Sequence, residues 1–235
     1  ASGVTAITFG IGAFFLGLAE VPDLSIALKQ IVTNSVVAAG SALIVGFFVL
    51  GILQNIEQLF NITTGMTLAD YRDPRNPLLR QLQQLAPGTF NHSRQVADIA
   101  EAATEAIGGD SLLAYVGGLY HDIGKMNKPE YFVENQTGYN RHKDLKPSMS
   151  LLVIIGHVKD GIELAREYDL PRELIHFIEA HHGTTLVEYF YHAAMKEAAE
   201  NGEPINEMQF RYPGPKPHTK ESAILMISDA VESAS

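Results

Sequence analysis

Two long stretches without charge near the N-terminus are the strongest constraint on how this 235-residue chain can fold. Residues 1–19 carry no charged side chain, and residues 30–56 form a second stretch of the same kind. The charged residues between them are Glu20, Asp23 and Lys29. About 20 apolar helical residues cross a bilayer core of roughly 30 Å, whereas a long helix of a soluble core normally keeps a polar face. The sequence therefore predicts two transmembrane helices within residues 1–56, in contact with membrane lipid.

The flanking sequence indicates how such a hairpin would sit in a membrane. A signal peptide is disfavoured, because no basic region precedes the first stretch and a second stretch follows it. Basic residues gather on the cytoplasmic side of membrane spans, and three arginines follow the second stretch: Arg72, Arg75 and Arg80. The chain begins without methionine and ends inside a helical pattern. We therefore expect a fragment of a longer membrane protein, with its C-terminal part in the cytoplasm.

The overall charge and the missing cysteines exclude several classes of site. The net charge is −10, which argues against a nucleic-acid polymer as partner, because such proteins carry a basic surface. A phosphate-containing substrate stays open, since bound metal ions can supply positive charge. The chain has no cysteine, so disulfides, thiolate zinc sites and iron–sulfur clusters are excluded.

The rest of the chain has a helical pattern. Residues 57–86 read as a connector with a juxtamembrane helix, and Asp73-Pro74 and Asn76-Pro77 mark turns within it. Residues 87–235 show apolar side chains at helical spacing and no alternating strand pattern of useful length. Helices are expected at residues 89–107, 110–123, 148–168, 171–183, 184–201 and 219–234. Asp110 is expected to cap the second of these helices, and Gly124 to stop it. The fold class is thus predicted as all-α, a helical bundle preceded by two transmembrane helices.

Five histidines and two aspartates lie on apolar faces of these expected helices. They are His92, His121, Asp122, His157, His181, His182 and Asp229. A single histidine on an apolar face is usually an ordinary core residue. Seven such groups in one domain would be costly to bury without a shared partner. Neutral imidazole and carboxylate are good metal ligands, so metal coordination is the simplest explanation.

Seven ligands exceed what one small ion uses. If Asp122 bridges, they divide into two sets of four around two divalent ions. Two neighbouring ions can bind phosphate oxygens and share an activated hydroxide, which suits phosphodiester hydrolysis. Nitrogen and oxygen ligands without thiolate favour iron or manganese over structural zinc.

The order of these residues resembles that of the HD-domain phosphohydrolase superfamily. His92 comes first, then His121-Asp122 within His-Asp-Ile-Gly-Lys, then a distal Asp229. Longer stretches resemble the seven-transmembrane-receptor HD proteins, a bacterial membrane family that includes cyclic di-AMP phosphodiesterases. These stretches are Ala86-Pro-Gly-Thr-Phe-Asn-His-Ser, Tyr131-Phe-Val-Glu-Asn-Gln, Gly156-His-Val-Lys-Asp-Gly, His181-His-Gly-Thr-Thr-Leu-Val and Phe210-Arg-Tyr-Pro-Gly-Pro-Lys-Pro. The resemblance extends from about residue 65 to the end.

The resemblance implies specific roles. One ion would be held by His92, His121, Asp122 and Asp229, and the other by Asp122, His157, His181 and His182. Asp122 and His121 would be the catalytic pair, and Lys125 would face a substrate phosphate. The implied reaction is hydrolysis of cyclic di-AMP to linear pApA, by an HD domain that faces the cytoplasm at the bacterial inner membrane.

Three other functions remain open from the sequence. The related HD-GYP branch hydrolyses cyclic di-GMP, but it carries Gly-Tyr-Pro after its double histidine, where this chain has His181-His-Gly-Thr-Thr. Nucleotide monophosphatases with one metal lack the additional histidines. A membrane receptor that binds a nucleotide without cleaving it is the third alternative. The native metal, the sensed signal and the oligomeric state, a homodimer included, are also left open.

Overall fold

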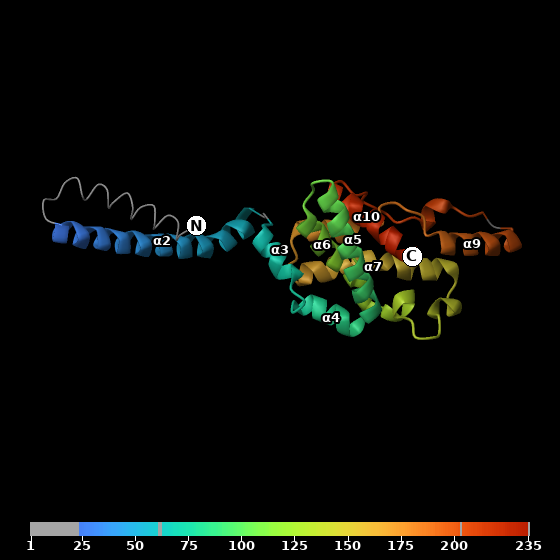
Figure 1. Ribbon diagram of the computed structural model, residues 1–235. Coiled ribbons are helices and arrows are strands. Elements are labelled where there is room, and N and C mark those ends of the chain that lie inside the picture. Colours follow the sequence, from blue (N-terminus) through green and yellow to red (C-terminus); the bar gives the residue numbers. More distant parts are fainter. Residues whose placement is uncertain (1–23, 61–62, 203, 235) are drawn as a thin grey trace. The chain divides into compact units, whose positions relative to one another are not determined.

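The computed structural model describes residues 24–60, 63–202 and 204–234, and these are helical almost throughout (Figure 1). The chain divides into two units, residues 1–62 and 63–235. The first contains α2 (Leu24–Phe60). The second contains α3 (Gly65–Arg72), α4 (Pro77–Leu85), α5 (Pro87–Ala106), α6 (Ser111–Tyr120), α7 (Pro147–Glu167), α8 (Arg172–Ala180), α9 (Glu188–Asn201) and α10 (Lys220–Ser233). The predicted all-α fold is confirmed for the described residues, where the β-type contact is an isolated bridge between Leu186 and Arg211.

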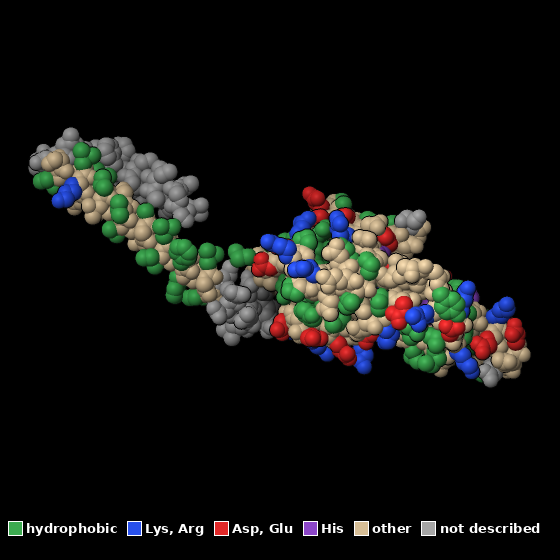
Figure 2. Space-filling view, turned by 90° about the horizontal axis from the view of Figure 1, so that it is seen from below, with side chains coloured by type: hydrophobic (Ala, Val, Ile, Leu, Met, Phe, Trp, Pro, Cys, Tyr) green, Lys and Arg blue, Asp and Glu red, His purple; other side chains and the backbone are tan. Residues whose placement is uncertain are grey.

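Helix α2 contains the second of the two predicted spans. Its segment Leu28–Ile52 is long and apolar enough to cross a membrane, by length and composition. Large apolar side chains along it are exposed, including Ile44 at 72% and Phe47 at 76%, and Figure 2 shows hydrophobic side chains along this helix. The first predicted span, residues 1–19, lies outside the described residues. One helix of this kind is therefore found in the described part of the chain, where the sequence predicts two in all.

The segment expected as a connector forms two short helices, α3 and α4. The side chain of Thr64 caps α3, and Asn76 caps α4 with Pro77 in the first turn. Both caps accept hydrogen bonds from backbone N–H groups that the helix itself leaves unpaired. Leu68 from α3 is buried in the hydrophobic core, as are three leucines of α4, namely Leu78, Leu79 and Leu82. Helices α3 and α4 thus contribute side chains to the bundle's core.

Helices α5 and α6 pack closely against each other at the centre of the bundle. A Cβ at Gly118 would lie 2.7 Å from the Cα of Ala97, so only glycine allows this approach. Asp110 caps α6 as the sequence predicts, because its Oδ1 accepts a hydrogen bond from Leu113 N–H at 2.9 Å. This packing fixes the position at which α6 ends, where the His-Asp pair follows.

The end of α6 differs from the prediction. The sequence indicates a helix up to Ile123 that Gly124 stops, but α6 ends at Tyr120 and a 3₁₀ turn, η1 (Ile123–Asn127), follows. A Cβ at Gly124 would lie 1.9 Å from His157 O and 2.4 Å from Gly161 N. Gly124 is therefore required for the close approach of η1 to α7, which brings the start of η1 next to His157.

The remaining helices lie close to their predicted ranges. A second apolar cluster, formed by Leu151, Phe190 and Phe210, joins α7, α9 and the 3₁₀ turn η5 (Glu207–Phe210). Between η1 and α7 the chain makes further short 3₁₀ turns: η2 (Pro129–Tyr131), η3 (Val133–Asn135) and η4 (Arg141–Asp144). Helix α10 packs on α5, α6 and α8, so the last helix of the chain lies beside the earlier ones that carry the histidines.

Candidate metal centre

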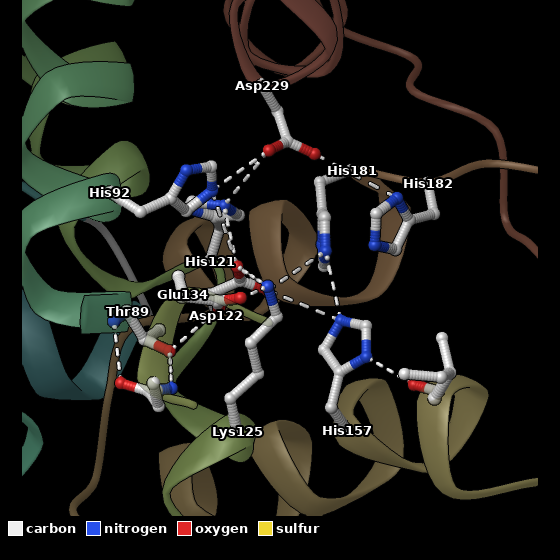
Figure 3. Close-up of polar contacts among 12 residues, drawn as sticks. Thr89, His92, His121, Asp122, Lys125, Glu134, His157, His181, His182 and Asp229 are labelled. Carbon is white, nitrogen blue, oxygen red and sulfur yellow. Dashed lines mark hydrogen bonds and ion pairs between the residues drawn. The ribbon is translucent and has the colours of Figure 1, made fainter. Parts of the chain in front are cut away.

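All seven residues that the sequence singles out meet in one place (Figure 3). Helix α5 contributes His92, the end of α6 contributes His121 and Asp122, and α7 contributes His157. His181 and His182 directly follow α8, and Asp229 lies on α10. His182 is partly exposed, and the other six are buried. The helical periodicity that placed these residues on inner faces is therefore consistent with the packing of five separate elements around one centre.

Three groups of side chains present their ligand atoms within 4.8 Å of one another, and one of them, His121 with Asp122 and His181, links the other two, which we call clusters. The first cluster contains His92, His121 and Asp229, and the second contains His157, His181 and His182. In the first, His92 Nε2 lies 3.0 Å from Asp229 Oδ1. In the second, His157 Nε2 and His181 Nε2 are 3.2 Å apart. Each cluster thus has three donor atoms that converge.

Asp122 lies between the two clusters, with one oxygen toward each. Its Oδ2 is 3.5 Å from His92 Nε2 and 3.4 Å from His121 Nε2. Its Oδ1 is 3.3 Å from His157 Nε2 and 3.5 Å from His181 Nε2. A single buried carboxylate therefore contacts histidines of both clusters.

Backbone carbonyls set the orientation of three of the imidazole rings. Nδ1–H of His121 donates to Gly118 O at 2.7 Å, that of His157 to Ile154 O at 2.5 Å, and that of His181 to Ile178 O at 2.8 Å. A ring that donates through Nδ1 carries a lone pair on Nε2, as in metal-binding histidines. All three Nε2 atoms face Asp122.

The donor atoms fit divalent cations. His92 Nε2, His121 Nε2 and Asp122 Oδ1 are buried without a hydrogen-bond partner, and such atoms are rare in folded proteins unless an ion or water meets them. The lone pairs of His157 Nε2 and His181 Nε2, 3.2 Å apart, would repel each other without a cation. That spacing is close to the ~3 Å between adjacent ligands whose metal–nitrogen bonds are ~2.1 Å.

The two clusters differ in their electrostatics. Burial lowers the pKa of His121, but Asp122 and Asp229 outweigh this effect and raise the pKa to about 10. Burial lowers the pKa of His157 to about 3, and Asp122 offsets only part of that effect. Burial would raise the pKa of Asp229, but the neighbouring rings of His121 and His92 outweigh this effect and hold it well below its usual value. The centre therefore holds ionised carboxylates beside a neutral His157, and their charge must be balanced by a proton on His121 or by cations.

Lys125 lies inside this centre rather than on the surface. Its Nζ is 2.7 Å from Asp122 Oδ2 and 3.0 Å from Glu134 Oε1, and its side chain is 14% exposed. Burial lowers the pKa of Lys125, but the Asp122 and Glu134 carboxylates outweigh this effect and raise the pKa above its usual value. The ring of Phe132 lies 5.1 Å from the ammonium group. Lys125 is thus a fixed positive charge beside Asp122.

A hydrogen-bond network that the sequence analysis did not assign holds Glu134. Thr89 Oγ1–H donates to Glu134 Oε1 at 2.9 Å, and Asn135 Nδ2–H donates to Thr89 Oγ1 at 2.8 Å. A Cβ at Gly88 would lie 2.0 Å from Glu134 O, so the turn η3 contacts the start of α5 directly. Glu134 and Asn135 belong to the Tyr131-Phe-Val-Glu-Asn-Gln stretch, and the resemblance of that stretch to the family was the sequence feature that pointed to them.

Two further side chains at the centre also escaped assignment. The ring of Tyr212 stacks on His182, with centroids 4.1 Å apart and an interplanar angle of 27°. Tyr212 lies within the Phe210-Arg-Tyr-Pro stretch, but nothing in its spacing points to His182. Glu232 Oε2 lies 2.5 Å from His92 Nδ1. Its sequence signal was its position three residues after Asp229, one turn along the same helix.

Comparison with known proteins places the chain in a family. The HD domain pattern matches residues 89–234. The chain is 40% identical over 232 residues to "Cyclic-di-AMP phosphodiesterase PgpH" of Bacillus subtilis (strain 168), and 41% identical over 236 residues to the protein of that name from Listeria monocytogenes serotype 1/2a (strain 10403S). Both alignments cover 95% of this chain and 32% of the relative, so the chain spans about a third of the length of these curated relatives.

A solved structure agrees with this result. The L. monocytogenes phosphodiesterase PgpH HD domain, crystallised in complex with cyclic-di-AMP, is 48% identical and superimposes with a TM-score of 0.65. The likeness covers 69% of this chain and 74% of that one. The resemblance deduced from the sequence motifs is thereby confirmed. The chain belongs to the HD domain family and, within it, to the group of PgpH-like proteins.

Proposed function

We propose that this chain is part of a metal-dependent phosphodiesterase that hydrolyses cyclic di-AMP to linear pApA. The seven converging residues would hold two divalent ions and share Asp122. One ion would be bound by His92, His121, Asp122 and Asp229. The other would be bound by Asp122, His157, His181 and His182.

The position of Asp122 carries this proposal. Its two oxygens face different histidine clusters at 3.3–3.5 Å, and the buried nitrogens around it include two without a hydrogen-bond partner. A one-metal site would need only one of these clusters. The choice of cyclic di-AMP rests on the 48% identity to an HD domain that was crystallised with that ligand.

The protein's own side chains would bind, orient and balance charge. When bound, two divalent ions would supply positive charge for phosphate oxygens and lower the pKa of a water molecule. Backbone carbonyls keep the Nε2 atoms of His121, His157 and His181 directed inward. Lys125, held by Glu134, is placed to donate a charge-assisted hydrogen bond to a phosphate oxygen. The donor set of nitrogen and oxygen atoms supports iron or manganese as the metal.

We also propose that the N-terminal part spans a membrane twice, through residues 1–56, and that the helical unit faces the cytoplasm. The apolar, exposed surface of α2 supports contact with lipid. The basic residues that follow it support the orientation. The proposed division is residues 1–56 for the membrane part, 57–86 for the connector and 87–235 for the HD domain. For comparison, the family pattern begins at residue 89, and the structural unit begins at Thr63.

Product analysis with the complete chain in detergent tests the proposed function. The manganese-loaded protein is incubated separately with cyclic di-AMP, cyclic di-GMP and a nucleoside monophosphate, and products are separated by chromatography. We expect linear pApA from cyclic di-AMP and much slower cleavage of the other two. Preferred cleavage of cyclic di-GMP would reassign the base specificity. Binding of cyclic di-AMP without cleavage by the metal-loaded protein would identify a receptor instead.

A further inference from the structure

His92 contacts α10 through both of its ring nitrogens. Its Nε2 lies 3.0 Å from Asp229 Oδ1, and its Nδ1 lies 2.5 Å from Glu232 Oε2. Asp229 and Glu232 are three residues apart on α10, so they share one face of that helix. The side chains of His92 and Glu232 are only 10% and 16% exposed, so little water competes for this contact.

The partner of Nδ1 sets His92 apart from the other oriented histidines. His121, His157 and His181 donate Nδ1–H to backbone carbonyls of their own segments. His92 uses a carboxylate that follows it by 140 residues. The orientation of this ring therefore depends on a side chain that a point mutation can remove. The backbone partners of the other three rings cannot be removed in that way.

We infer that Glu232 is a positioning residue for the metal centre, which acts by orienting His92. Its carboxylate accepts the hydrogen bond from His92 Nδ1–H, so the lone pair lies on Nε2 and faces Asp122 and Asp229. A carboxylate on the far nitrogen of a metal-binding histidine fixes the ring and makes it a better ligand. This inference rests on the proposed two-metal function.

The inference predicts an effect confined to one of the two ions. His92 belongs to the set with His121, Asp122 and Asp229. In the second set, His157 and His181 are oriented by the backbone carbonyls of Ile154 and Ile178. Loss of Glu232 should therefore weaken the binding of one ion and leave the binding of the other unchanged. General damage to the fold would weaken the binding of both ions.

The test measures metal binding, independently of turnover. The complete chain in detergent is stripped of metal and titrated with Mn²⁺ by calorimetry, and bound metal is counted by elemental analysis. Glu232→Ala should weaken one of two sites by about 10–100-fold and leave the other unchanged. Glu232→Gln keeps an oxygen that accepts from Nδ1–H, and should stay within a few-fold of the parent chain. Glu105→Ala, an exposed carboxylate on α5, is the matched control and should bind as the parent does.

The other outcomes separate the inference from the function on which it rests. A parent chain that binds no metal would overturn the proposed two-metal function itself. Two normal sites in Glu232→Ala would overturn the role of Glu232 and leave that function standing. Equal weakening of both sites, or a lower Tm of the metal-free variant, would also overturn it, because either marks a general structural role. A Glu232→Gln variant as weak as Glu232→Ala would overturn the hydrogen-bond basis.

Discussion

Asp122 lies beside both histidine clusters, so a single substitution at this position should affect both of them. Its Oδ1 and Oδ2 each lie within 3.5 Å of two histidine nitrogens. We predict that Asp122→Ala loses both ions and abolishes hydrolysis, because neither set of four is then complete. Elemental analysis should show the metal content falling from two per chain toward zero. Asp98→Ala, an exposed aspartate on α5, is the control. A variant that keeps two metals and normal turnover would remove Asp122 from the bridging role.

Lys125 allows a separate test of substrate binding. Lys125 is not one of the seven proposed ligands, although its ammonium group contacts the carboxylates of Asp122 and Glu134, so its removal should leave the metals bound. We predict that Lys125→Ala raises KM for the dinucleotide about 10–100-fold, equivalent to roughly 1.5–3 kcal/mol for one charge-assisted phosphate contact. Steady-state kinetics with parallel metal analysis measures both quantities. Lys196→Ala, on the exposed side of α9, should behave as the parent. Unchanged KM and kcat would exclude a phosphate contact by Lys125.

Among single residues, the candidate metal ligands could be selected from the sequence because histidine and aspartate are conspicuous on apolar helical faces. Their supporting residues could not. Glu134 meets Thr89 across 45 positions of chain, and Glu232 meets His92 across 140. Such pairs exist only after the helices have packed. A glutamate near the end of an amphipathic helix carries no local sign of its distant partner.

Among the helices, the contact between α10 and the start of α6 has a pH dependence. Glu221 Oε1 accepts a hydrogen bond from Asp110 N–H at 3.0 Å. Burial raises the pKa of Glu221, but backbone hydrogen bonds from Asp110 and from Glu221 itself outweigh this effect and lower the pKa below 4.5. Because the pKa of Glu221 is lower in the folded protein than in the unfolded chain, its carboxylate contributes fully to stability at pH values above the unfolded-state pKa. This contribution is lost as the pH falls through the lower folded value.

We therefore predict that Glu221→Ala lowers the free energy of unfolding by about 0.5–1.5 kcal/mol at pH 7, toward the low end because solvent screens a half-buried surface carboxylate. The difference from the parent should shrink near pH 3. Chemical denaturation at both pH values measures it, with Glu197→Ala on α9 as the exposed control. An equal difference at both pH values would contradict the role of the ionised carboxylate.

The contact between η1 and α7 depends on a residue without a side chain. Alanine at position 124 would place a Cβ 1.9 Å from His157 O and 2.4 Å from Gly161 N. Backbone atoms cannot rotate away, so η1 must shift, and Asp122 with it. We predict that Gly124→Ala lowers stability by roughly 1–3 kcal/mol and reduces turnover. Thermal melts and product assays measure the two effects.

Gly156 provides the matched control for that substitution. It lies on α7 with nothing within 4 Å of a built Cβ, so Gly156→Ala should be neutral or stabilising by about 0.4–1 kcal/mol. A Gly124→Ala variant with the stability and turnover of the parent would show that the two elements can separate without cost.

The accuracy of the element predictions depends on helix length. Helices α5, α7 and α10, with 20, 21 and 14 residues, repeat their apolar pattern often enough for the period to be recognised. Helices α3 and α4 have 8 and 9 residues, too few for a clear period, and turn formers surround them. The end of α6 was misplaced because a glycine that permits close packing looks the same in a sequence as one that stops a helix.

For the whole molecule, the division between the two units can be tested by truncation. We predict that residues 63–235 alone are soluble and hydrolyse the dinucleotide, because the seven proposed ligands all follow Thr63. The complete chain should require detergent, since the apolar side chains of α2 are exposed. A start at Met66 should give a less stable protein, because it removes the Thr64 cap and the 2.5 Å hydrogen bond from Thr63 to Glu173. Size-exclusion chromatography and thermal melts compare the three.

A complete chain that is monodisperse without detergent would contradict the membrane prediction. The uneven charge distribution made the division into an apolar N-terminal part and a charged part visible in the sequence. The packing of α3 and α4 onto the bundle was not visible, because leucines of a short amphipathic helix do not specify their partner.

The distance along the chain between α5 and α10 has a consequence for biosynthesis. Glu232 follows His92 by 140 residues, and ribosomes add roughly 5–20 residues per second. About 7 to 28 s therefore pass between the synthesis of these two side chains. Helix α2 is made before either of them, so the nascent chain can engage a translocation machinery well before the two histidine clusters are complete. The ion whose proposed ligands include Asp229 can then bind only after α10 has left the exit tunnel.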